Sequence, residues 1–290
     1  MKTYTFDRLI CLIATALLLT LAISCQESGP RNEIALVSDR TGDQDIYLFD
    51  VDTHSMTALT EDQAEDWSPT WSPDGSKLAF ASTRDEGWNI YVLKLKNREV
   101  VPLTDSGKDS RPSWSPDGSM IAFTSARDGN TEIYVMRSDG SEPQNLTNHL
   151  ARDDRPVWSP SGENIAFSSD RDGDWEVYLL NVTTKGIERL THNSVEDFPA
   201  SWSNDGTGII LESNSDVVHF SFEQGKVTTL AGGESKEGTS DYSPNGEWIA
   251  FESDRSGDYD IWVMKADSSD VRNLTQHPAF DWYPRWRPSR

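Results

Sequence analysis

The stretch "WSPDGSKLAF" at residues 71–80 is repeated almost unchanged as "WSPDGSMIAF" at residues 114–123. The steps between successive aromatic residues that open such copies are 43, 44, 44, 40 and 44 residues. A period of this length is typical of solenoid and propeller repeats. The chain is therefore expected to consist of six similar units. The four further copies are "WSPSGENIAF" from Trp158, "WSNDGTGIIL" from Trp202, "YSPNGEWIAF" from Tyr242 and a shortened "WRPSR" from Trp286.

One repeat contains four short segments of β-forming residues separated by turn residues. In the second copy, the segment "PSWS" (112–115) precedes "PDG", in which proline fixes φ and glycine accepts a positive φ. The segments "MIAFTS" (120–125), "EIYVMR" (132–137) and "PQNLT" (143–147) follow, again with turns between them. Four short antiparallel strands at this spacing predict one blade of a β-propeller.

The two ends of the repeat array complement each other. The array begins at "IALVSD" (34–39), which corresponds to a second strand, and ends at "YPRWRP" (283–288), which corresponds to a first strand. The last strand is therefore expected to complete the first blade and close the ring, which hides the sheet edges that an open array would expose. We predict an all-β, six-bladed propeller over residues 33–290.

The repeat "DSRPSWSPDGSMIAFTSARDGNTEIYVM" (109–136) resembles that of the TolB-like propellers. The resemblance extends over nearly all of residues 33–290. It implies a six-bladed propeller in the bacterial periplasm, where the family's namesake works in the Tol–Pal system. That protein also carries an N-terminal α/β domain, to which no segment of this sequence corresponds. Membership in the Tol–Pal machinery is implied only weakly, because propellers support many functions.

The N-terminal residues have the features of an export signal. The charged segment "MKTYTFDR" (1–8) is followed by the apolar run "LICLIATALLLTLAIS" (9–24). Cys25 comes directly after this run, in a context that resembles the lipobox of bacterial lipoproteins. An ordinary signal peptidase site at 22–24 is the alternative. We expect a signal peptide over 1–25 and a linker over 26–32.

A lipid on Cys25 would anchor the protein to a membrane of the cell envelope. Gln26 stands after the cysteine, and the lipoprotein sorting rule then implies the outer membrane, with the protein facing the periplasm. We expect the protein to act as a monomer. The net charge of −22, from 48 acidic and 26 basic residues, argues against binding to nucleic acid or to anionic lipid surfaces.

An acidic residue lies five positions before the aromatic residue that opens each copy. First strands line the central channel of a propeller, so these acids are expected to form a ring where the channel opens. We call this side of the molecule the top face and the opposite side, with the "SPDG" turns, the bottom face. The six acids are Asp66, Asp109, Asp153, Asp197, Glu237 and Asp281.

Two interpretations of this acidic ring remain open. Each acid could pair with a neighbouring arginine of a top-face turn or cap its own turn through backbone N–H groups. Alternatively, an unpaired remainder could attract a cation, a peptide amine or a lysine side chain. The fifth unit, "LESNSDVVHF" (211–220), lacks the arginine turn, so the acids outnumber these arginines by six to five. The arginines are Arg40, Arg84, Arg127, Arg171 and Arg255.

Tryptophans fall into a repeating and a non-repeating set. The tryptophans that open the copies are expected to pack between blades. Trp67 and Trp282 instead follow ring acids on adjacent blades and fall in expected top-face segments. Exposed tryptophan is enriched where proteins bind partners. The six acids with Trp67 and Trp282 are therefore the candidate partner-binding residues.

These observations favour a non-enzymatic, membrane-anchored module that binds an envelope protein or peptide. The alternative is a metal-dependent propeller enzyme of the lactonase or lyase type, with its site at the channel mouth. A ring stabilised by calcium at that mouth is a third possibility. The sequence contains no GxSxG nucleophile motif and no glycine-rich phosphate loop. It therefore assigns no catalytic residue, no metal ligand and no required cofactor.

Overall fold

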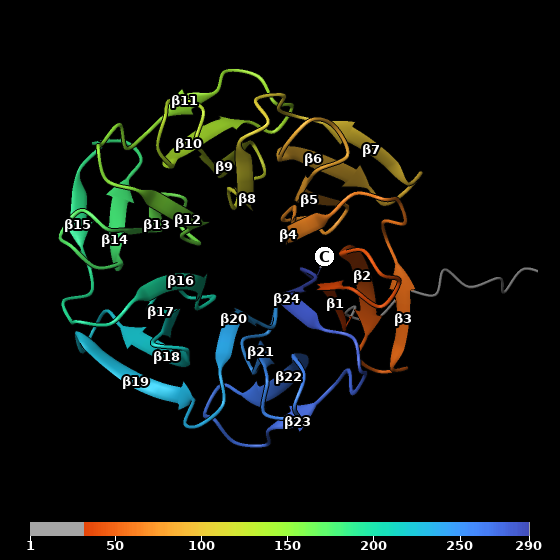
Figure 1. The fold of residues 1–290 in the computed structure, drawn as a ribbon. Helices are drawn as coiled ribbons and strands as arrows, with labels where there is room; N and C mark the ends of the chain where they lie inside the picture. The colour runs from red at the N-terminus through yellow and green to blue at the C-terminus, as the bar shows by residue number, and fades with distance from the viewer. Residues whose placement is uncertain (1–31, 290) are drawn as a thin grey trace, which may run out of the picture. The chain divides into compact units, whose positions relative to one another are not determined.

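The computed structural model describes residues 32–289, which form a ring of six four-stranded antiparallel sheets (Figure 1). The predicted six-bladed propeller is confirmed. The innermost strand of each blade begins at one of the ring acids and ends at the aromatic residue of the repeat. These inner strands are β4 (Asp66–Trp71), β8 (Asp109–Trp114), β12 (Asp153–Trp158), β16 (Asp197–Trp202), β20 (Glu237–Tyr242) and β24 (Asp281–Trp286).

The second strands form the buried middle of each blade, and in β5 every residue after the first is buried. Such strands are packed on both faces, which explains their nearly continuous apolar sequences. The second strands are β1 (Glu33–Ser38), β5 (Lys77–Ser82), β9 (Met120–Ser125), β13 (Asn164–Ser169), β17 (Gly208–Ser213) and β21 (Trp248–Ser253).

The third strands pair along their full length with the second strands. In the second repeat, Glu132 faces Ser125 and Arg137 faces Met120. The two predicted segments of that repeat, 120–125 and 132–137, therefore match the observed strands. The third strands are β2 (Asp45–Asp50), β6 (Asn89–Lys94), β10 (Glu132–Arg137), β14 (Glu176–Asn181), β18 (Asp216–Ser221) and β22 (Asp260–Lys265).

The outer strands are the most variable element of the blade. The prediction of a strand over 143–147 is too long, because only two residues of that segment pair with β10. In contrast, the fifth unit has a six-residue outer strand on the rim (Figure 1). The outer strands are β3 (Ser55–Ala58), β7 (Glu99–Pro102), β11 (Gln144–Asn145), β15 (Ile187–Arg189), β19 (Lys226–Ala231) and β23 (Arg272–Asn273).

The ring closes through the C-terminal strand. β24 pairs antiparallel with β1, so that the first blade has the order β24-β1-β2-β3. At the bottom face, the Glu33 carbonyl accepts a hydrogen bond from the Arg287 amide at 2.8 Å, and a side-chain ion pair joins the same residues. The predicted closure is confirmed, and the described chain enters the ring at the bottom face.

Tryptophans of the repeat join neighbouring blades, as expected. Trp71 is 6% exposed and packs with Ala35 and Leu78, which belong to two adjacent blades. Its Nε1 donates to the carbonyl oxygen of Arg285, 3.0 Å away in the preceding inner strand. Trp114, Trp202 and Trp286 likewise pack with residues of two neighbouring blades.

Five of the six inner strands, all except β24, lead into a hairpin turn that is stabilised by hydrogen bonds between its own side chains. In "SPDG", the Ser72 hydroxyl and the Ser76 amide both donate to Oδ1 of Asp74, at 2.6 and 3.0 Å. These hydrogen bonds, with that of Ser72 first, lower the pKa of Asp74 to about 2. Gly75 has φ of 62°, which is readily adopted only without a β-carbon. The repeated motif is thus a bottom-face hairpin turn.

Candidate binding site at the top of the channel

The six ring acids occupy the first position of the six inner strands, and their side chains are buried. Asp66, Asp109, Asp153 and Asp281 are 0% exposed, and the other two acids are 1% exposed. The sequence predicted that these acids form a ring where the channel opens, either paired within the molecule or partly free. In the structure each side chain is enclosed between its inner strand and a top-face loop.

Five of the acids form ion pairs with the arginine of that loop. In one blade, Nη2 of Arg84 lies 2.9 Å from both carboxylate oxygens of Asp66, and its Nε donates to Ser82 at 2.9 Å. The guanidinium also lies over the Phe80 and Tyr91 rings. The equivalent pairs are Arg40–Asp281, Arg127–Asp109, Arg171–Asp153 and Arg255–Glu237.

Asp197 is the one ring acid with no arginine in the top-face loop of its blade, as the sequence of the fifth unit indicated. A two-residue turn, Asn214 and Ser215 with φ of 50° and 64°, replaces the arginine loop. Asn193 donates to Oδ2 of Asp197 at 2.6 Å, while Oδ1 has no hydrogen-bond partner among the described residues. Burial raises the pKa of Asp197 despite hydrogen bonds to this carboxyl group.

The ion pairs show that the ring acids hold the loops around the channel mouth in place. The acidic ring is largely neutralised within the molecule, which supports the first of the two interpretations. A direct contact between these acids and a partner stays an untested prediction, and it would require their exposure. In the structure their role is to fix the loops that surround the channel mouth.

Trp67 and Trp282 lie side by side at the top face, although they are far apart in the sequence. Their rings stack with centroids 5.8 Å apart, and Phe280 stacks on Trp282 at 5.4 Å. Tyr283 meets Trp67 edge-on at 4.8 Å. Phe280 is 38% exposed. We call these four residues the aromatic stack, and it spans the junction between the closing blade and the next blade.

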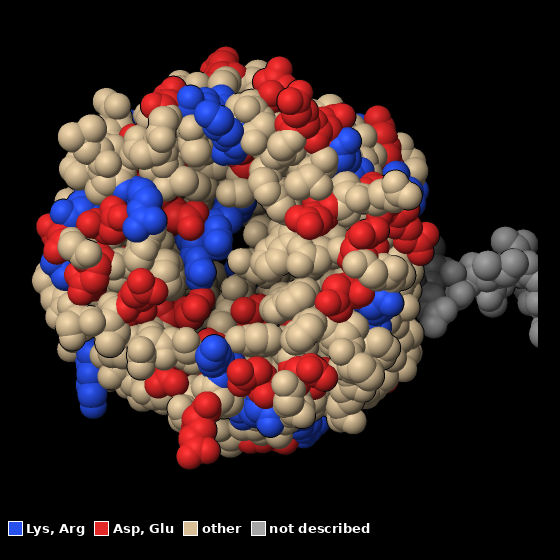
Figure 2. Space-filling view, in the orientation of Figure 1, with Lys and Arg blue, Asp and Glu red and all other residues tan. Residues whose placement is uncertain are grey.

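Arginines in the channel mouth were missed by the sequence analysis. Lys and Arg side chains gather in the central hollow, although acidic groups dominate the surface around it (Figure 2). Arg111 and Arg155 line the upper channel together with Tyr283. Nη1 of Arg111 lies 3.3 Å from the Tyr283 hydroxyl, and the Arg155 guanidinium lies 4.1 Å from the centre of the Phe198 ring.

A backbone feature directs these side chains inward. The third residue of four inner strands has positive φ, between 52° and 55°: Ser68, Arg111, Arg155 and Tyr283. The register between inner and second strands shifts at this position. Non-glycine residues rarely adopt this conformation, and it costs on the order of 1 kcal/mol each. In the sequence, a proline directly follows each of these four residues, as in "SRPSW" and "DRPVW".

Two glutamates of neighbouring blades, Glu212 and Glu252, lie near these arginines, and Glu212 lines the same space. Glu212 pairs with Arg155 at 2.6 Å. Glu252 accepts a hydrogen bond from the Tyr283 amide at 2.9 Å, and a side chain at Gly238 would collide with its carboxylate. Burial, with a smaller contribution from Glu212, raises the pKa of Glu252 to about 7. The mouth therefore combines fixed positive charge with a group that titrates near neutrality.

The channel mouth and its aromatic stack define the class of protein as a β-propeller with a candidate binding site on its axis. Residues 18–154 and 89–240 match the family model described as PD40, the TolB beta propeller domain. The chain therefore belongs to the TolB beta-propeller family.

Similarity to individual relatives covers short segments. A protein TolB homolog of Chlorobium luteolum is 40% identical over 63 residues, 22% of this chain and 14% of that protein. The Tol-Pal system protein TolB of Anaeromyxobacter dehalogenans is 49% identical over 45 residues, 16% of this chain and 10% of that protein. An uncharacterized Agrobacterium fabrum protein is 38% identical over 74 residues, 26% of this chain and 25% of that protein. The matched part is thus a quarter or less of each relative.

Solved structures show the same fold over most of the chain. The crystal structure of TolB from Acinetobacter baumannii has a TM-score of 0.81 at 26% identity, covering 89% of this chain and 67% of that one. A putative TolB from Agrobacterium tumefaciens has a TM-score of 0.70 at 22% identity, covering 89% and 91%. An oligogalacturonate lyase in complex with manganese shares only the fold, with a TM-score of 0.56 at 14% identity and coverage of 84% and 73%.

Two further findings concern the residues that the structure describes. None of their segments is a helix long and apolar enough to span a membrane. Residues 32–289 also contain no group of three or more histidine, cysteine or acidic side chains arranged to hold a metal ion. Cys25, the rest of the expected signal peptide and residues 26–31 of the expected linker lie outside the described residues.

Proposed function

We propose that this protein is a non-enzymatic binding module of the bacterial cell envelope that engages a protein or peptide at the top of the propeller. The observation that carries the proposal is the aromatic stack beside the channel mouth. Partly exposed Trp and Tyr next to Arg have the composition of binding hot spots. Membership in the TolB propeller family supports a role in the envelope.

The charges indicate which group the channel mouth would accept. The sequence analysis considered a cation or a peptide amine, attracted by unpaired acids. The ring acids are buried. The open space is lined by Arg111 and Arg155, which pair with Asp154 at 3.3 Å and Glu212 at 2.6 Å, and by Arg285, which has no ion-pair partner among the described residues. An acidic side chain or a terminal carboxylate is therefore the better match for the channel, with apolar side chains resting on the aromatic stack.

The test is affinity capture from solubilised envelopes followed by measured affinities for the captured protein. Replacing both Trp67 and Trp282 by Ala should weaken binding at least 30-fold, since one hot-spot side chain contributes about 2 kcal/mol or more. Val227→Ala on the outer strand is the matched control, because Val227 is also exposed, at 43%, but lies on the rim. Equal affinity of the double variant and the control would refute the top-face site.

We propose further that acylated Cys25 anchors the protein to the outer membrane. The described chain enters the ring at the bottom face, next to Arg287. An anchor joined through a linker of a few residues would turn this face toward the bilayer and present the aromatic stack to partners. Cys25→Ser should move the protein from the membrane to the soluble periplasmic fraction. A wild-type protein found in the soluble fraction would contradict the anchor.

A further inference from the structure

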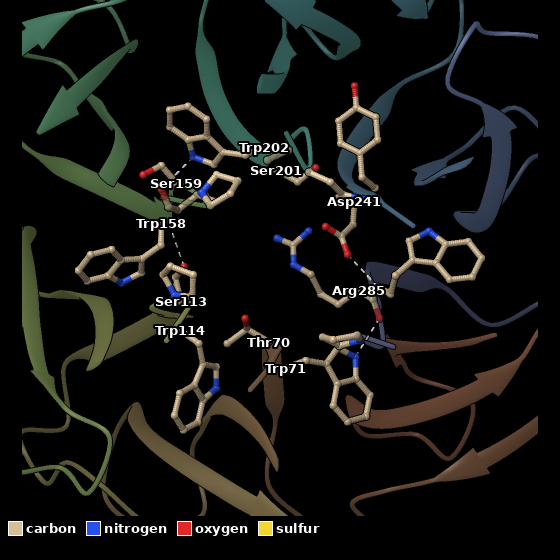
Figure 3. Close-up of a pocket in the computed structure, with 18 of the residues that line it drawn as sticks. Thr70, Trp71, Ser113, Trp114, Trp158, Ser159, Ser201, Trp202, Asp241 and Arg285 are labelled. Carbon is tan, nitrogen blue, oxygen red and sulfur yellow. Dashed lines mark hydrogen bonds between the residues drawn. The ribbon is translucent and has the colours of Figure 1, made fainter. Parts of the chain in front are cut away.

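A larger pocket lies at the bottom end of the channel, and Arg285 lines both this pocket and the narrow space above it. Its volume is about 440 Å³. The lining residues include prolines of the bottom turns and the repeat tryptophans, whose rings point outward from the central space (Figure 3). The space at the top of the channel is only about 40 Å³. The bottom pocket can thus hold a small molecule, which would enter from the bottom face.

The charged residues of this pocket break the symmetry of the repeat. The fifth residue of each inner strand lines the wall, and in four blades it is small or neutral: Thr70, Ser113, Val157 and Ser201. The other two blades, which are neighbours, carry Asp241 and Arg285 at this position. Both side chains point into the pocket from the same side (Figure 3).

These two charges do not neutralise each other by direct contact. No salt bridge joins Asp241 and Arg285, and within residues 32–289 neither has another ion-pair partner. Arg285 Nη1 donates to the carbonyl oxygens of Ser240 and Pro284, at 3.1 and 3.3 Å. Asp241 accepts the Trp286 amide at 2.8 Å. Two opposite charges thus face one cavity, and each can form further hydrogen bonds or an ion pair with a ligand.

Asp241 and Ser201 are polar groups whose burial in the pocket wall is unfavourable, and a bound ligand could offset this by supplying a charge or a hydrogen bond. Burial raises the pKa of Asp241 to about 6, although Arg285 and backbone hydrogen bonds act in the opposite direction. Ser201 is 94% buried in the wall, and its hydroxyl has no hydrogen-bond partner among the described residues. Buried polar groups of this kind normally have a partner.

We propose that the bottom pocket binds a small zwitterion, a free α-amino acid or a dipeptide. The carboxylate of the ligand would pair with Arg285 and its ammonium group with Asp241. Hydroxyl groups on the wall would bind the remaining polar atoms, and prolines of the bottom turns, Pro116, Pro160 and Pro244, would contact an apolar side chain. Opposite charges on neighbouring blades match opposite charges on one small molecule, which a neutral sugar or a simple ion would not satisfy.

Isothermal titration calorimetry at pH 7.5 with L-alanyl-L-alanine as probe tests this proposal. The wild-type protein should bind the free dipeptide at least tenfold more tightly than N-acetyl-L-alanyl-L-alanine or L-alanyl-L-alanine amide, each of which lacks one charge. Absence of binding at millimolar concentrations, or equal binding of all three probes, would overturn the proposal. This comparison needs only the wild-type protein and is unaffected by variants that fail to fold.

Variants then locate the site. Asp241→Asn and Arg285→Gln should each weaken dipeptide binding at least tenfold, while Lys226→Gln on the outer strand β19 should bind as the wild type does. Unchanged binding in either pocket variant would place the dipeptide elsewhere and contradict the assignment. The result is independent of partner capture at the top face, so either proposal can fail alone.

Discussion

At the scale of single residues, the buried acid of each blade is defined by the side chain that faces it. Asp153 has Arg171 at 3.0 Å, whereas Asp197 has only the neutral Asn193. Removing one partner of a buried ion pair leaves the other charge uncompensated. A buried carboxylate that has no cation beside it is already destabilised by desolvation. Equivalent positions in one molecule therefore respond differently to the same substitution.

We expect Asp153→Asn to lower the free energy of unfolding by roughly 2–3 kcal/mol, because it strands the Arg171 guanidinium. Asp197→Asn should change it by less than about 1 kcal/mol at pH 7, because no guanidinium is stranded. Urea denaturation of both variants measures the difference. If both variants lost the same free energy of unfolding, the ion pair with arginine would make no contribution of its own to stability.

Residue identity alone was enough to align these acids and their arginines, because both recur with the repeat. It was not enough to find Arg111 and Arg155 as channel residues. Their inward direction depends on a positive φ at the register shift between two strands. The proline that follows each such residue recurs with the repeat, but a residue before proline is expected to be extended, so proline does not predict a positive φ. The stacking of Trp67 on Trp282 depends in the same way on ring closure, which brings together residues at opposite ends of the chain.

At the scale of elements, β24 determines whether the propeller is a ring or an open array. It supplies the inner strand of the first blade, and Trp286 packs with Ile34 and Ile261 across a blade interface. The sequence predicted this strand and its pairing from the incomplete units at the two ends. In the second repeat, the sequence predicted that the inner strand begins at residue 112, but it begins at residue 109. The register shift within this strand interrupts the alternation of buried and exposed residues on which the prediction depends.

Deletion of residues 281–290 should abolish the cooperative thermal transition, because it opens a sheet edge and removes a blade interface. Circular dichroism melting of the truncated protein measures this. Deletion of residues 289–290 alone serves as the control, since it leaves β24 intact. A truncated protein that melts at the wild-type temperature would contradict closure as the source of stability.

At the scale of the whole molecule, the stability of the fold depends on pH because the protein is acidic and several of its carboxyl groups are buried. Burial raises the pKa of Asp45, Asp66 and Asp197, and it raises those of Asp241 and Glu252 to about 6 and about 7. A carboxyl group whose pKa is raised by folding stabilises the native state at low pH, and this contribution is lost as the pH rises through the folded pKa. The net charge of −22 adds repulsion in the same direction.

The melting temperature should therefore fall as the pH is raised from about 5 to about 8, by roughly 5 °C for a change of a few kcal/mol in a protein of this size. Below about pH 4 the trend should reverse, because turn carboxylates such as Asp74 and Asp205, with pKa values of about 2, lose their hydrogen bonds on protonation. Melting scans across this range check both arms. A melting temperature that rises from pH 5 to pH 8 would contradict the account.

The central claim is that the top face, with its aromatic stack, is the recognition surface of this propeller. A photocrosslinking amino acid at position 280 in living cells tests it most directly, because Phe280 is exposed at the end of the stack. The same probe at Ser161, in a bottom-face turn, is the matched control. We predict one envelope protein crosslinked from position 280, absent from position 161 and lost when Trp67 and Trp282 are replaced by Ala. Crosslinking from position 161 alone, or from position 280 regardless of the two tryptophans, would contradict the claim.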